Sequence, residues 1–223
     1  MRINKYVALA TGMSRRAADT AIDAGRVLVN GDHPQPGQDI AAEDWVTLDG
    51  RRVSTDVKIQ TIMLNKPTGY VCSRDGQGSK TIYELLPAEL HHLKPVGRLD
   101  KYSSGLLLLT NDGQLAHELT HPSRQKNKIY EVTLKKPLQP LHRQMISDHG
   151  VMLDDGPSKF ELQRQKDGDE TKWIVTMHEG RNRQIRRTFS ALDYGINRLH
   201  RTTLGPYQLD QLDKGKWQDI VSE

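Results

Sequence analysis

The apolar positions of the first sixty residues change their spacing along the chain. Apolar residues recur at helical intervals over 3–10 and again over 17–22, which predicts two short helices. Ser14 is a suitable N-cap for the second helix. Apolar runs at 27–29 and 46–48 are each followed by a turn sequence, Asn-Gly or Asp-Gly, which is typical of short strands. The pattern predicts two small helices followed by a compact hairpin region.

The stretch 51–58 is polar and has no apolar period, which is typical of a boundary between domains. We therefore divide the chain into domains at 1–58 and 59–223. After the boundary, apolar runs at 62–64 and 70–72 flank a turn that contains proline and glycine, so we expect a strand, a turn and a second strand.

The most apolar run of the chain is Leu106–Leu109, four consecutive leucines that we expect to be buried. The segment 128–134 alternates apolar and polar residues and predicts a strand with Tyr130, Val132 and Leu134 on one face. Beyond Leu199 the pattern predicts only short strands without chemistry of their own. Further strands are expected near 160–162 and 173–177, and helices near 81–86, 114–119, 138–145 and from 179–187 towards 192.

Composition narrows the class of protein. The 223 residues carry 32 Lys and Arg against 28 Asp and Glu, a net charge of +4, which suits contact with polyanions through local patches. The single cysteine, Cys72, excludes an internal disulfide and fits a reducing compartment. No apolar run approaches the roughly 18 residues of a membrane span, and no signal peptide follows Met1. We expect a soluble cytoplasmic protein with no membrane partner.

One carboxylate stands directly before the leucine run. Asp100 follows Arg98 and precedes the turn sequence Ser103-Ser104-Gly105. A carboxylate at the mouth of a buried element is well placed for chemistry, because the core fixes it and partial desolvation tunes it. On spacing alone, a surface turn with an ordinary Arg–Asp pair is the more frequent explanation.

Three segments in order resemble the catalytic motifs of the RsuA-type ribosomal RNA pseudouridine synthases. Residues 97–113 resemble the first motif, although the family usually has threonine where Ser103 stands. Residues 128–134 resemble the second motif and 179–187 the third. The Lys66-Pro67-x-Gly69 element also recurs near the active site of that family.

The resemblance implies a role for each matching residue. Asp100 would be the catalytic carboxylate and Arg186 its ionic partner. Tyr130 would stack on the uracil and take part in removing the proton from carbon 5, with Ile185 as the opposite wall. Arg98 would fill or brace the space that the target base leaves in the RNA. Further RNA or substrate contacts would come from Lys66, Arg181, Arg183 and Arg187. Without the motifs, a half-buried strand tyrosine and a solvated helix face would explain these residues.

The N-terminal segment has a basic side. Arg15, Arg16 and Arg26 lie on or beside the two predicted helices, and such a face can neutralise phosphates without reading sequence. Charge alone favours a solvated helix face. The order of residues 14–31 resembles the S4 (α-L-like) RNA-binding domain, and this resemblance implies phosphate contacts for the three arginines.

We therefore expect an α+β protein: a small S4 domain, and a pseudouridine synthase domain built on a mostly antiparallel mixed sheet flanked by helices. The expected reaction converts uridine to pseudouridine in ribosomal RNA. Residues 155–157 and 179–184 resemble the large-subunit enzymes more than the small-subunit one, and this resemblance favours large-subunit RNA. The reaction oxidises nothing and imports no group, so we expect no cofactor and no metal. The expected partner of the monomer is ribosomal RNA or an assembly intermediate. The alternatives are a non-catalytic RNA-binding assembly factor and a synthase acting on transfer RNA. Whether Asp100 attacks the ribose or acts as a base towards a glycal stays open.

Overall fold

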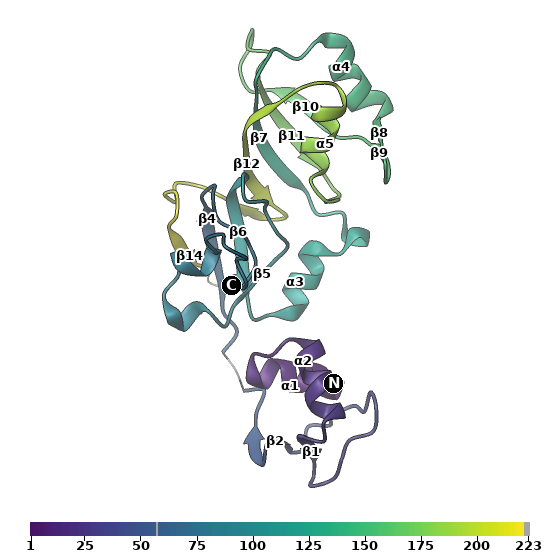
Figure 1. The fold of residues 1–223 in the computed structure, drawn as a ribbon, viewed down its shortest axis with the longest axis vertical. Helices are drawn as coiled ribbons and strands as arrows, with labels where there is room; N and C mark the ends of the chain where they lie inside the picture. Colours follow the sequence, from purple (N-terminus) through teal and green to yellow (C-terminus); the bar gives the residue numbers. More distant parts are fainter. Residues whose placement is uncertain (57, 221–223) are drawn as a thin grey trace. The chain divides into compact units, whose positions relative to one another are not determined.

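The computed structural model describes residues 1–56 and 58–220 (Figure 1). It divides the chain into two compact units, Met1–Ile59 and Gln60–Glu223. Val57, which belongs to the polar stretch placed at the domain boundary, lies outside the described residues, as do the last three residues of the second predicted domain. Each unit is described by itself.

The first unit packs two helices against a three-stranded antiparallel sheet with the order β1-β2-β3. Ser14 caps α2 as predicted, because its Oγ accepts a hydrogen bond from the Ala17 amide at 3.0 Å. The predicted boundary stretch begins with a strand, since positive φ angles at Asp49 and Gly50 fold a tight turn that pairs β3 with β2. The elements are α1 (Ile3–Thr11), α2 (Arg15–Asp23), β1 (Val27–Val29), β2 (Val46–Leu48) and β3 (Arg51–Val53).

The second unit is built on a nine-stranded sheet in its described part. The main path of the sheet has the order β10-β11-β7-β12-β6-β4-β14, with β13 beside β12 and β5 beside β6. Among the described strands, β6 and β12 form the parallel pair and the other pairs are antiparallel, so the sheet is mixed and mostly antiparallel as predicted. The strands are β4 (Thr61–Lys66), β5 (Lys94–Pro95), β6 (Ser104–Thr110), β7 (Lys128–Leu134), β10 (Glu161–Arg164), β11 (Lys172–Met177), β12 (Ile196–Leu204), β13 (Tyr207–Gln208) and β14 (Trp217–Asp219).

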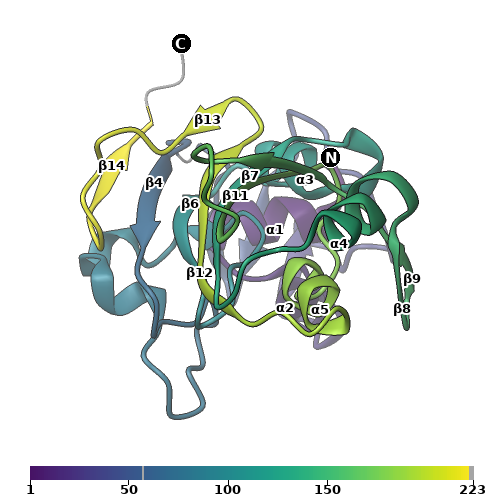
Figure 2. The same ribbon diagram turned by 90° about the horizontal axis from the view of Figure 1, so that it is seen from above.

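Helices and a separate hairpin flank this sheet, and Figure 2 shows α5 beside α4 and the β8–β9 hairpin. The helical segments are η1 (Ile82–Leu85), η2 (Ala88–Leu90), α3 (Gly113–Thr120), η3 (Pro122–Arg124), α4 (Pro140–Gln144), η4 (Met145–His149) and α5 (Gln184–Ala191). The hairpin joins β8 (Val151–Leu153) to β9 (Gly156–Ser158).

One local prediction in this unit is wrong. The expected strand at 70–72 is reduced to an isolated bridge between Val71 and Thr81, because the polar, glycine-containing segment that follows supplies no partner strand. The short helix expected at 81–86 forms as the 3-10 helix η1, which ends before Pro87. A capping box, in which Glu84 accepts a hydrogen bond from the Thr81 amide at 2.7 Å, closes this turn.

The four leucines of β6 are buried on both faces of the sheet. Leu107 and Leu109 belong to the larger core cluster, which also contains Tyr130 and Val132 of β7. The neighbouring Leu106 and Leu108 pack in a second cluster with Leu119 of α3. Because β6 is fixed from both sides, the loop that leads into it is anchored at its end.

Strand β12 approaches β6 closely at Gly105. This glycine has a φ of +105°, and a Cβ placed there would lie 2.1 Å from the Arg201 carbonyl oxygen and 2.6 Å from the Arg201 nitrogen. Strand β12 itself runs over nine residues and pairs with both β6 and β7. The prediction of short strands beyond Leu199 is confirmed by β13 and β14, but it missed the length of β12.

We expect Gly105→Ala to lower the free energy of unfolding by about 1–3 kcal/mol or more, since the added methyl group has no space and the backbone is left-handed. Urea unfolding of the whole chain measures this change. Gly113→Ala is the matched control, because nothing lies within 4 Å of a Cβ at that position. Equal unfolding midpoints for the two variants would contradict the close approach of β6 and β12.

Candidate active site

Asp100 lies in the loop between β5 and β6. The neighbouring Leu99 and Ser103 are buried, and the Ser103 amide donates to the Asp100 carbonyl oxygen at 3.0 Å to close a tight turn. The Asp100 side chain keeps 31% of its surface exposed. The loop thus holds a carboxylate in place while leaving it accessible to a substrate.

Lys66, at the end of β4, binds the backbone of this loop. Its fully buried side chain donates from Nζ to the carbonyl oxygens of Pro67 at 3.0 Å, Asp100 at 3.1 Å and Ser103 at 2.9 Å. The prediction that Lys66 contacts RNA or substrate is therefore wrong, because the ammonium group is enclosed by backbone carbonyls. Burial lowers the pKa of Lys66 to about 8.

Two arginines from the start of α5 flank the carboxylate. Arg183 Nη1 lies 3.4 Å from Asp100 Oδ2, and Arg186 Nε lies 3.9 Å from the same oxygen. Arg186 also donates from Nη2 to the Tyr102 carbonyl at 2.8 Å and to Ser103 Oγ at 3.3 Å. Burial and the nearby Arg183 lower the pKa of Arg186, and Asp100 opposes this effect. The resemblance pairs Arg186 with Asp100, and the structure adds Arg183 at a shorter distance.

Arg183 has an uncommon backbone conformation. Arg183 is the N-cap of α5 and has φ 46° and ψ 31°, a left-handed conformation that is uncommon for a residue with a side chain. Such conformations concentrate at functional sites, where the surrounding structure maintains them.

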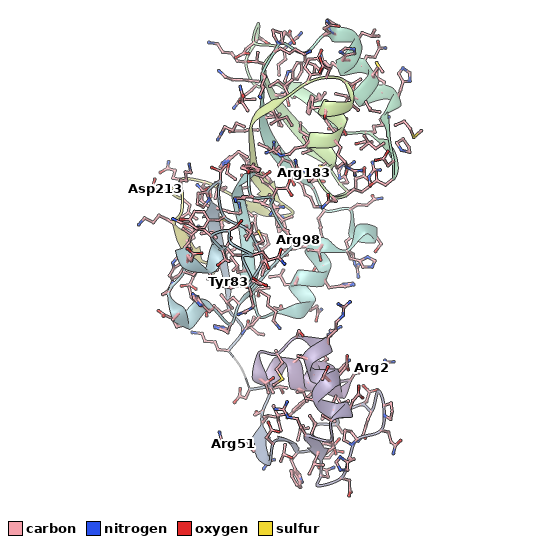
Figure 3. All side chains as sticks on the ribbon, in the orientation of Figure 1. Arg2, Arg51, Tyr83, Arg98, Arg183 and Asp213 are labelled. Carbon is pink, nitrogen blue, oxygen red and sulfur yellow. The ribbon has the colours of Figure 1, made fainter. Side chains whose placement is uncertain are left out.

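A cavity of about 330 Å³ opens beside Asp100. Tyr130 from β7 and Ile185 from α5 line it, and both are almost fully buried. Arg98 and Arg183, labelled in Figure 3, line the same cavity. The structure thus brings together the carboxylate, the tyrosine and the isoleucine that the three motifs contribute, together with Arg186.

Arg181 and Arg187 were predicted to contact RNA, and the structure engages both within the protein. Arg181 Nη1 lies 2.9 Å from Asp155 Oδ1, and Arg187 Nη2 lies 2.7 Å from Asp155 Oδ2. Hydrogen bonding from Arg187, with the charge of Arg181, lowers the pKa of Asp155. These pairs tie the β8–β9 hairpin to the start of α5, although Arg181 also lines the cavity.

Two cationic residues of the cavity wall were missed from the sequence. Arg201 of β12 and Lys128 of β7 both line it. Arg201 is buried and follows the buried Leu199 at a spacing of two along a strand. A polar residue at an inward position of an alternating pattern is a signal that could have identified it.

The arrangement limits what the site can hold. Within the described residues, no group of three or more His, Cys, Asp or Glu side chains is placed to hold a metal ion. Among the same residues, no helix is both long and apolar enough to cross a membrane. Two guanidinium groups lie near one oxygen of the Asp100 carboxylate, beside a cavity lined by an aromatic and an aliphatic side chain. Such a lining suits a flat ring.

Comparison with known proteins identifies the family. The family model for RNA pseudouridylate synthase matches residues 60–191. An Aquifex aeolicus protein named as an RNA pseudouridine synthase is 37% identical over 99% of this chain and 90% of its own length. A crystal structure of a pseudouridylate synthase matches with a TM-score of 0.72 and 31% identity, covering 99% of this chain and 96% of that one. The chain therefore belongs to the RNA pseudouridine synthase family of enzymes.

Two further relatives differ in their named targets. Ribosomal large subunit pseudouridine synthase B of Pseudomonas aeruginosa is 36% identical over 98% of this chain, and the match spans 59% of that protein. Ribosomal small subunit pseudouridine synthase A of Pasteurella multocida is 33% identical over 100% of this chain and 97% of its own length.

The Lys66 geometry generates a prediction about pH. Folded Lys66 has a pKa of about 8, against an ordinary value of 10.5, so between these pH values the unfolded chain binds the additional proton. The unfolding free energy of the wild type, relative to Lys66→Met, should therefore rise with pH above 8. Urea unfolding of both proteins from pH 7 to 9.5 measures the difference. A difference that stays constant would show that the three carbonyls offset the burial of the ammonium group.

Proposed function

We propose that this enzyme converts uridine to pseudouridine in ribosomal RNA, with Asp100 as the carboxylate that acts on the ribose. The observation that carries the proposal is the placement of Asp100 at the mouth of a cavity that Tyr130 and Ile185 line. The named targets of the Pseudomonas and Pasteurella relatives support ribosomal RNA as the substrate.

The geometry suits each part of the reaction. The bond between ribose carbon 1′ and uracil N1 breaks, and carbon 1′ then bonds to carbon 5 of the same base, which loses its proton. Arg183 Nη1 and Arg186 Nε place positive charge 3.4 and 3.9 Å from Asp100 Oδ2. Tyr130 and Ile185 hold the flat ring, and the tyrosine takes part in removing the carbon 5 proton. Arg98, exposed at the edge of the cavity, braces the space that the base leaves in the RNA.

The relatives' names include both ribosomal subunits. Our proposal therefore covers ribosomal RNA as a class. Large-subunit RNA is favoured within it by the motif resemblance at 155–157 and 179–184, and separate large- and small-subunit transcripts in the assay test that preference.

We propose further that the first unit is an S4 RNA-binding domain. Helix α2 begins with Arg15 and Arg16 and has no acidic residue in its first turn. Two cations at a helix N-terminus oppose the helix dipole, so this arrangement lowers helix stability and concentrates positive potential where a phosphate can bind. Arg26 contributes less, because Nε and Nη2, which form one edge of its guanidinium group, donate to Asp49 at 2.8 and 2.6 Å.

We expect Asp100→Asn to abolish the release of tritium from ribosomal RNA labelled at uridine carbon 5, by about 10⁴-fold or more, since removal of a reacting group has effects of that size. The assay contains purified protein and labelled RNA, either free or in partly assembled subunits. Asp167→Asn, an exposed aspartate in the β10–β11 loop, is the matched control and should retain wild-type activity. RNA binding without tritium release by the wild type would instead support an assembly factor, and release from transfer RNA alone would change the substrate.

We expect the double change Arg15→Gln and Arg16→Gln to flatten the dependence of log affinity on log salt by roughly 1 to 2, because each phosphate contact contributes about 0.7 to 0.9. Filter binding of ribosomal RNA between about 50 and 200 mM salt measures the slope. Arg26→Gln should change it less, since Asp49 already pairs with that side chain. A slope that stays unchanged in the double variant would remove the S4 assignment.

A further inference from the structure

Arg201 is a buried cation without a full set of partners. Its side chain lines the cavity, and only 3% of the residue surface is exposed. Its Nε donates to the Leu106 carbonyl at 2.9 Å, whereas Nη2 is buried and has no hydrogen-bond partner among the described residues. The described residues also supply no carboxylate that pairs with it. A buried charge in this state is costly unless a ligand completes its hydrogen bonds.

The position of Arg201 is set by two neighbouring strands. It lies opposite Tyr130 in the register of β12 with β7, and beside Gly105 in the register of β12 with β6. Residues directly opposite each other in a sheet project on the same face, so Arg201 and Tyr130 share a face. The close approach at Gly105 fixes the Arg201 backbone. The guanidinium group therefore belongs to the part of the cavity where the base would stack on Tyr130.

Burial restricts what can reach this group. The phosphates of an RNA chain stay on the backbone that crosses the protein surface, whereas a flipped base enters the pocket. A guanidinium group only donates hydrogen bonds, so its partner on the base must be an acceptor. Uracil carries two carbonyl oxygens, O2 and O4, on the edges of its ring.

The cavity wall near Arg201 is electropositive. Lys128 lies on the same wall, where its Nζ donates to the carbonyl oxygens of Lys126 at 3.1 Å and His178 at 3.3 Å. Burial and the charge of Arg201 lower the pKa of Lys128, while Glu179 opposes them. Two cations on one wall favour a ligand that carries or develops negative charge.

We propose that Arg201 donates to a carbonyl oxygen of the target uracil and stabilises the negative charge that the base carries while it is detached. The inference rests on the proposed function. When the bond between carbon 1′ and N1 breaks, its electron pair moves onto the base and is shared with the carbonyl oxygens. Carbon 1′ bonds to the Asp100 carboxylate, or Asp100 takes the proton of carbon 2′; both routes leave an anionic base. Carbon 5 of that base then attacks carbon 1′. On the first route this attack breaks the bond from carbon 1′ to Asp100, and on the second route Asp100 returns its proton to carbon 2′. The carbon 5 proton passes to solvent, and N1 takes up a proton from solvent.

The experiment pairs a protein change with an atomic change in the substrate. Arg201→Gln is compared with Arg198→Gln, a change on the same strand of an exposed arginine that pairs with Glu131 outside the cavity. Ribosomal RNA is transcribed with uridine, 2-thiouridine or 4-thiouridine, each tritiated at carbon 5. The thiouridines are used because sulfur accepts hydrogen bonds more weakly than oxygen. Tritium release gives kcat and KM, filter binding gives RNA affinity, and urea unfolding gives stability.

We expect Arg201→Gln to lower kcat by about 10²-fold or more, as loss of one charge-stabilising donor does, with RNA affinity and unfolding midpoint close to those of Arg198→Gln. Sulfur at the contacted oxygen should slow the wild type by about 10-fold and slow Arg201→Gln no further, since the contact is already lost. If 2-thiouridine slows the wild type but not Arg201→Gln, the contacted oxygen is O2. The same result with 4-thiouridine identifies O4.

If each thio-substituted RNA lowers kcat by the same factor in the wild type and in Arg201→Gln, the inference is overturned and the proposed function stands. Where Arg201→Gln does not fold, Arg201→Lys enters the same comparison and is interpreted in the same way. If the wild type releases no tritium from any of the RNAs, the proposed function fails and the inference fails with it.

Discussion

The geometry of the active-site loop depends on one buried ammonium group. Lys66 donates to three carbonyl oxygens, and two of them belong to the turn that contains Asp100. Carbonyl dipoles that converge on one point repel each other unless a cation lies between them. The Asp100 carboxylate is thus positioned through its own backbone, while its side chain remains available to the arginines of α5. Lys66 therefore orients the backbone of Asp100, and the arginines of α5 orient its side chain.

The parts of the fold that local pattern determines could be predicted from the sequence. The alternation at 128–134 gave β7 with its bounds and its buried face, and the four leucines gave the buried strand β6. Strand β12 could not be predicted in the same way. Its length and place depend on pairing with β7 and on an approach to β6 that requires a glycine nearly one hundred residues earlier. Pairing between distant segments leaves little trace in the local pattern.

The candidate site, too, could be predicted only in part. The resemblance of three motifs named Asp100, Tyr130 and Ile185, and the structure brings them to one cavity. What the sequence could not show was the surroundings of each cation. Lys66 faces carbonyl oxygens, Arg187 faces Asp155 and Arg201 faces the cavity, although all three are simply basic residues in the sequence. Their roles follow from which acceptor each one meets in the folded chain.

The residues that line the cavity lie between Val96 and Leu204, within the second compact unit. The first unit carries Arg15 and Arg16 at the start of α2. If the first unit binds RNA as proposed, mutations in it would change which RNA is held, and how tightly, while the residues that line the cavity of the second unit stay the same. A single chemical centre can in this way be directed to different targets by the divergence of a separate small domain.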